Sequence, residues 1–158
     1  MTEQDDFAVW LAGAVLRTDD RDVAALALQD IASQAGELEL DAKLDEMRKF
    51  NRAGGDFGAE IIGPLLIPIL VEAAKQLWAA YLKKIAEKTA GALADVTAKT
   101  VKDLIRAAWS SDNVVLTSEL EAHIRAAATE QNLPQEELDR LIASLRNPKL
   151  GHELAATD

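Results

Sequence analysis

The two histidines are the first residues in this chain whose side chains could do chemistry. His123 has one carboxylate, Glu119, a helical turn before it, and His152 stands near the C-terminal end. One histidine and one carboxylate fall short of the three or four ligands that a zinc site needs. The chain has no cysteine, which excludes disulfides, thiolate metal sites and cysteine nucleophiles. We interpret both histidines as surface or boundary residues and expect neither a metal nor a cofactor.

Carboxylates and glycines gather at three other places. The run Asp19-Asp20-Arg21-Asp22 lacks the alternating ligands, central glycine and closing glutamate of a calcium loop, so we interpret it as capping the next helix. Glu60 and Glu72 border an apolar stretch and are interpreted as marking helix ends near solvent. Gly54-Gly55 lacks the Lys-Ser/Thr of a phosphate loop. With no nucleophile, base and orienting group in view, the sequence predicts a non-catalytic protein.

The composition indicates which elements must carry these residues. Of 158 residues, 49% are apolar but only 4% are aromatic, and alanine is abundant. Alanine favours helices, whereas strands favour β-branched and aromatic side chains. We therefore predict an all-α fold, a bundle of about five to seven helices built around one long central helix or a kinked helix pair.

Charge divides the chain into three blocks, which we expect to form one compact unit. Residues 1–57 carry net charge −7, residues 58–110 carry +2, and residues 111–158 carry −5. The net charge of −10 therefore belongs to the two flanks, and attraction to the mildly basic middle favours their docking. Direct nucleic-acid binding is not expected, because neutralising phosphates needs a basic surface.

The N-terminal block predicts three helices. Apolar residues recur at intervals of three and four within residues 7–15, 23–31 and 38–50. In the second helix the buried face is expected to consist of Val23, Leu26, Ala27 and Ile31. Residues 51–56, with adjacent glycines next to Asn and Asp, predict a loop.

The middle block opens with the uncharged run 61–71, which is shorter than the about 20 residues of a membrane-spanning helix. No proline follows between residues 69 and 109, so the pattern predicts one long helix that either breaks near Gly91 or projects from the globule. Leu82, Leu93 and Leu104 repeat every eleven residues, as a nearly straight amphipathic stripe would. In period and composition this stretch is similar to the amphipathic repeats of synucleins and exchangeable apolipoproteins, which is a likeness of pattern and not of family.

The C-terminal block predicts a helical hairpin. Residues 110–113 are expected to form a turn and residues 114–116 a short, extended linker. A helix to about Gln131 and a second helix stopped by Asn147-Pro148 follow. Residues after Lys149 are expected to form a tail.

Two functions of different classes fit this pattern. The first is a non-catalytic interaction or assembly subunit that associates with itself or another protein, with helix exchange between copies covering the long helix. The second is a membrane-active helical effector, pore-forming or bound to an anionic lipid surface, whose segments 61–71 and 72–108 are released from the acidic flanks. An acidic mimic of nucleic acid is a third, weaker possibility.

Both functions use the same candidate residues. An acidic N-terminus lacks the basic start of a secretory signal, so a cytoplasmic location is expected. Gly91 is the predicted hinge. The predicted partner or membrane contacts are Ile61, Ile62, Leu65, Leu66, Ile69, Leu70, Trp78, Tyr81 and Trp109, and the predicted basic edge is Lys83, Lys84, Lys88, Lys99 and Lys102.

Overall fold

The computed structural model describes residues 2–34, 39–53, 62–88 and 96–156. These residues form helices joined by short turns, and none of them forms a strand. The all-α prediction is therefore confirmed. The helices are α1 (Glu3–Thr18), α2 (Asp22–Gln34), α3 (Glu39–Ala53), α4 (Ile62–Lys88), α5 (Ala98–Gln131), α6 (Gln135–Ser144) and α7 (Lys149–Ala156).

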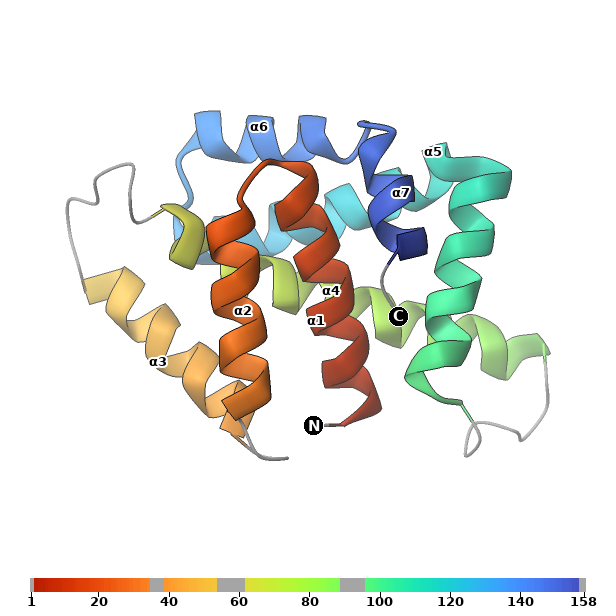
Figure 1. Ribbon diagram of the computed structural model, residues 1–158, viewed down its shortest axis with the longest axis horizontal. Coiled ribbons are helices and arrows are strands. Elements are labelled where there is room, and N and C mark those ends of the chain that lie inside the picture. Colours follow the sequence, from red (N-terminus) through yellow and green to blue (C-terminus); the bar gives the residue numbers. More distant parts are fainter. Residues whose placement is uncertain (1, 35–38, 54–61, 89–95, 157–158) are drawn as a thin grey trace.

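Helix α4 is the central helix that the sequence predicted. It makes its most extensive contacts with α5 and α1 and also touches α2 and α3. In Figure 1, α4 crosses behind α1 and α2, while α6 lies along the top and α7 packs beside the upper part of α1. Pro68 lies inside α4 and does not mark its start. A proline inside a helix removes one backbone hydrogen bond, and the packing of neighbouring helices around α4 offsets the stability lost with it.

Of the two alternatives predicted for residues 69–109, the structure shows the division into two helices and not one projecting helix. Helix α4 ends at Lys88, and α5 begins at Ala98, where the Thr97 hydroxyl accepts a hydrogen bond from the Thr100 N–H at 3.3 Å. The predicted hinge, Gly91, lies outside the described residues. Helices α4 and α5 pack against each other within one chain. Of the predicted stripe, Leu82 is partly buried, Leu104 is 38% exposed and Leu93 lies outside the described residues.

The predicted turn at 110–113 and extended linker at 114–116 are wrong, because α5 is helical through both. The ribbon of α5 instead changes direction between its green first half and its cyan second half (Figure 1). The Ser111 hydroxyl donates to the Ala108 carbonyl at 3.4 Å, and the Thr117 hydroxyl donates to the Val114 carbonyl at 3.1 Å. Side-chain bonds of this kind to the preceding turn bend helices without ending them.

Two further boundaries differ from the prediction, and one agrees with it. Helix α3 extends to Ala53, so the first half of the predicted loop is helical, and Gly54-Gly55 lies outside the described residues. Helix α5 does end at Gln131, followed by Asn132 in the left-handed conformation with φ 57°. After α6, the predicted tail forms α7, whose Leu150 and Leu154 are buried. A helix of this length is unstable on its own in water, and burial of those two leucines against the bundle stabilises it.

Ion pairs join the acidic flanks to the basic middle of the chain. Lys75 of α4 contacts Asp5 of α1 at 3.2 Å and also Asp41 of α3. Lys102 of α5 lies 3.4 Å from Asp6. The hydrophobic core contains side chains from all three charge blocks. Apolar burial and ion pairing therefore both favour packing of the flanks against the middle of the chain.

Candidate interaction site

The predicted apolar contacts on α4 lie inside the bundle. Leu66 and Ile69 are fully buried, and Leu65 and Leu70 are nearly so. Ile61 and the side chain of Ile62 lie outside the described residues. In this conformation these leucines and isoleucines are core residues, so a partner or a membrane could reach them only after the bundle opened.

The three predicted aromatic contacts are also engaged within the chain. Trp78 is buried, and its ring centroid lies 5.4 Å from that of Phe7 in α1. Tyr81 is buried beneath the ammonium of Lys84, which lies 4.6 Å from the ring centroid. Burial raises the pKa of the Tyr81 hydroxyl, and the nearby charge of Glu119 adds to the rise while Lys84 opposes it. Trp109 is partly buried and packs against the core.

The predicted basic edge is divided between two helices. Lys83 and Lys84 lie on α4, and Lys84 pairs with Glu119 of α5 at 3.0 Å. Lys99 is exposed on the first turn of α5, whereas Lys102 is buried between Asp6 and the Trp10 ring. The side chain of Lys88 lies outside the described residues. Lys84 and Lys102 therefore join helices to one another, and the lysines do not form one continuous cationic surface.

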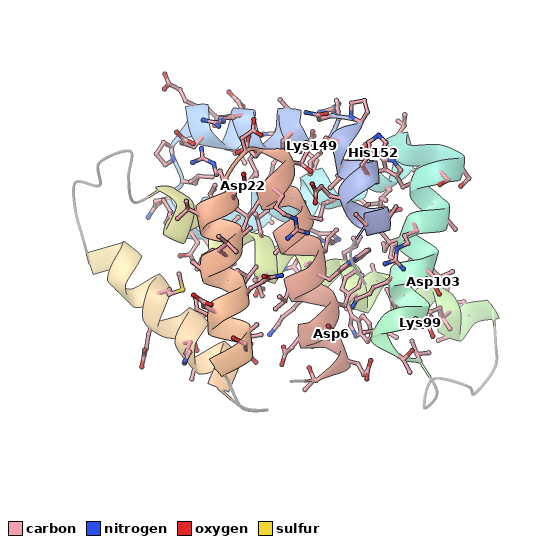
Figure 2. All side chains as sticks on the ribbon, in the orientation of Figure 1. Asp6, Asp22, Lys99, Asp103, Lys149 and His152 are labelled. Carbon is pink, nitrogen blue, oxygen red and sulfur yellow. The ribbon has the colours of Figure 1, made fainter. Side chains whose placement is uncertain are left out.

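A polar groove of about 600 Å³ lies where α1 and α5 begin. Figure 2 shows Asp6 of α1 and Lys99 and Asp103 of α5 at this lower end of the molecule. The Glu3 carboxylate accepts the Ala98 N–H, so the chain itself fills the N-terminus of α5 with an anion. Sequence analysis missed this pairing because the two residues lie 95 positions apart. The groove is lined by Glu3, Asp6, Thr97, Ala98, Lys99, Lys102 and Arg106.

Two cations of this groove, Lys102 and Arg106, have acceptors within the chain. Arg106 donates from Nε to the Leu154 carbonyl at 2.8 Å and from Nη1 to Asp103 at 2.9 Å. Its guanidinium also lies 5.1 Å from the Trp10 ring centroid. Through these pairs the groove joins α1, α5 and α7.

The acidic run 19–22 is a docking point for the C-terminal helices. Asp19 is buried and accepts from Arg21 at 2.9 Å and from Arg140 of α6 at 3.2 Å. Arg21 also pairs with Glu137 at 2.6 Å. The Asp19 carboxylate therefore bonds to two arginines, one of them on α6. Sequence analysis assigned this run to helix capping and missed the two partners on α6, because nothing in the local pattern indicates them.

The remaining polar candidates are the two histidines, Glu60 and Glu72. His123 Nδ1 lies 3.0 Å from Gln76 Oε1, and His152 is exposed near the C-terminal end (Figure 2). Glu72 lies inside α4 and accepts from Gln76 at 3.2 Å, so it does not mark a helix end as predicted. Glu60 lies outside the described residues. Among the residues described, no three His, Cys, Asp or Glu side chains come together as metal ligands.

The surface of the bundle exposes two pairs of large aliphatic side chains. Val23 and Leu26 on α2 are 82% and 63% exposed, and Val114 and Val115 on α5 are 68% and 52% exposed. The prediction that Val23 and Leu26 belong to the buried face of α2 is wrong. Small alanines let α2 approach its neighbours closely, so its inner face is formed by Ala24, Ala25, Leu28 and Ala32.

Comparison of the chain with protein-family models, curated proteins and solved structures finds no match. The functional argument therefore stands on the residues described above.

Proposed function

We propose that this chain is a non-catalytic, all-helical interaction or assembly subunit that associates with copies of itself. The observation that supports this proposal is the pair of exposed aliphatic side chains on α5, Val114 and Val115, which are adjacent in the sequence and 68% and 52% exposed. Exposed apolar groups placed next to one another are typical of contact surfaces. Their burial between two copies would be favourable for the same reason that the core forms.

The surroundings of this α5 pair suit contact between identical chains. Ser110, Ser111 and Ser118 are exposed on the same stretch of α5. Hydroxyl groups carry no charge, so these three serines add no repulsion when two copies meet.

Light scattering over a range of protein concentrations tests self-association. We expect a mass above that of the 17.1 kDa monomer that rises with concentration. The double variant Val114→Ser/Val115→Ser should lower the mass toward the monomer, because serine removes most of the apolar area. A strict monomer at every concentration would contradict the proposal.

A membrane-active effector is the second candidate, favoured by the length of α4. Residues Leu65–Glu87 form a 23-residue helix with mean hydropathy 1.4, long enough to cross a bilayer. The core helix of a bundle has the same properties, and 67% of that helix's apolar window is buried within the protein. Lys75 also lies near its middle, where a charge costs about 2.5–3.5 kcal/mol in a bilayer. We therefore rank this function second.

A further inference from the structure

The outer face of α2 carries an apolar pair that differs from the α5 pair in its electrostatic surroundings. Val23 and Leu26 lie three positions apart, so their side chains are neighbours on the helix surface. Asp22 and Asp30 lie four positions before and after Leu26 and are both exposed. This α2 face, consisting of Val23, Leu26, Asp22 and Asp30, is therefore apolar at its centre and acidic at both ends.

No cation within α2 offsets these carboxylates. The sequence of α2 contains neither lysine nor arginine. Arg21, just before the helix, pairs with Asp19 and Glu137, so its charge is already neutralised by those two carboxylates. The exposed side chains of α2 thus present apolar and anionic groups together, and a surface that fits them must be apolar and cationic.

A small groove between α1 and α2 lies next to this face. Its volume is about 160 Å³, comparable with cavities that hold one benzene ring. Asp6 and Arg17 stand at its polar edge, and each is already paired, with Lys102 and Glu153 respectively. The groove can therefore receive one large apolar side chain. It is lined by Asp6, Val9, Trp10, Gly13, Arg17, Ala25, Leu28 and Gln29.

We propose that the α2 face, with the adjoining groove, docks a basic amphipathic helix of a partner protein. The apolar stripe of that helix contacts Val23 and Leu26, one of its large side chains enters the groove, and its lysines or arginines pair with Asp22 and Asp30. This inference rests on the proposed interaction function and adds the chemistry of a partner. Figure 2 marks Asp22 at the start of α2, at the upper end of this face.

Charge decides among the other occupants. In a contact between two copies of α2, aspartates would face aspartates, because the helix has no cation to place between them. An anionic lipid surface would be repelled for the same reason. A basic helix can form ion pairs with the aspartates at both ends of the face, so it is the occupant that the charges favour.

The test uses a fluorescently labelled helical peptide of leucine and lysine, titrated with the full chain and followed by anisotropy. A matched peptide of leucine and glutamate is the control ligand. We expect the lysine peptide to bind, to weaken as salt is raised, and to outcompete the glutamate peptide. Val23→Ser/Leu26→Ser should weaken binding about tenfold or more. Asp22→Asn/Asp30→Asn should weaken binding and flatten its salt dependence, whereas Val114→Ser/Val115→Ser should leave it unchanged.

Three outcomes would overturn the inference. The lysine peptide could fail to bind, or it could bind the α2 variant and the wild type equally well. Light scattering could instead show that Val23→Ser/Leu26→Ser abolishes self-association, which would assign the α2 face to a second copy. The first two outcomes leave the proposed self-association through α5 standing, so the two proposals fail separately. All six substituted side chains are exposed, and circular dichroism verifies that each variant remains helical.

Discussion

At the scale of single residues, Gly13 of α1 and Gly151 of α7 have opposite roles. A Cβ atom added at Gly151 of α7 would lie 2.3 Å from Nε1 of Trp109. A Cβ added at Gly13 of α1 would meet only the flexible end of Arg17, at 3.1 Å. The small side chain at position 151 therefore lets α7 lie directly on the indole of α5. Trp109, predicted as a contact for a partner, is used within the chain for this packing.

Substitution of these two glycines by alanine distinguishes the effect of close packing on stability from the effect of helix propensity. Gly151→Ala should lower the free energy of unfolding by about 1–3 kcal/mol, because the indole or α7 must shift. Gly13→Ala should be neutral or stabilising by up to about 1 kcal/mol, because alanine favours a helix and Arg17 can move aside. Urea denaturation measures both changes. Equal effects of the two substitutions would contradict the close packing of α7 on Trp109.

At the scale of elements, Lys75 is the charge that ties three helices together. Its ammonium lies between Asp5 of α1 and Asp41 of α3, and its carbonyl accepts from the Gln4 amide at 3.4 Å. Burial alone would lower the pKa of Lys75, but hydrogen bonds and charge from Asp41 and Asp5 together outweigh burial. They raise the pKa above the ordinary 10.5. The charged form is therefore favoured in the folded state.

The raised pKa sets the pH range in which Lys75 stabilises the fold. Its contribution is fully present below the unfolded value of 10.5 and is lost as pH rises through the higher folded-state value. Lys75→Met should lower the free energy of unfolding at neutral pH by about 1.5–3 kcal/mol, because Asp5 stays buried without its partner. The difference from wild type should shrink above pH 10.5.

Urea denaturation at a series of pH values measures this difference. Lys83→Met is the matched control, because Lys83 is an exposed lysine on the same helix. The control should change the free energy of unfolding by less than about 0.5 kcal/mol at neutral pH. A difference between wild type and Lys75→Met that stays constant into the alkaline range would refute the role assigned to the ion pairs.

At the scale of the whole molecule, α4 determines whether the bundle is closed. Its aliphatic side chains fill the centre of the core, and α1, α2, α3 and α5 pack around it. Leu66→Asp places a carboxylate at a fully buried position. We expect it to unfold the protein or to cost more than about 4 kcal/mol, because an unpaired charge in the core has no compensating partner. Circular dichroism and urea denaturation follow this loss.

Vesicle binding by the wild-type chain separates the two candidate functions. If the bundle releases α4 to a membrane, sedimentation with anionic vesicles should be stronger at acidic pH, where protonation weakens the carboxylate side of the ion pairs. Neutral vesicles are the control for charge. An absence of binding to anionic vesicles at both neutral and acidic pH would eliminate the membrane function and leave the interaction function.

Apolar periodicity predicted the elements better than it predicted the faces that they bury. In α1 the predicted face of Phe7, Trp10, Leu11, Ala14 and Val15 is buried as expected. In α2 both sides carry apolar residues, and periodicity selected the side that faces solvent. Proximity of α1 and α4 favours the side with small alanines, and that preference is a property of the neighbours and not of the α2 sequence.

The sequence alone determined the helical class, the separation of acidic flanks from a basic middle, and the central position of the apolar helix. These follow from residue type and local spacing, because helix propensity and burial of apolar side chains act on each segment. Only the tertiary structure decided which charges meet, that α4 and α5 cover each other, and that Val23 and Leu26 remain at the surface. Those outcomes depend on residues far apart in the chain, such as Glu3 with Ala98 and Asp19 with Arg140, whose proximity exists only after the helices have packed.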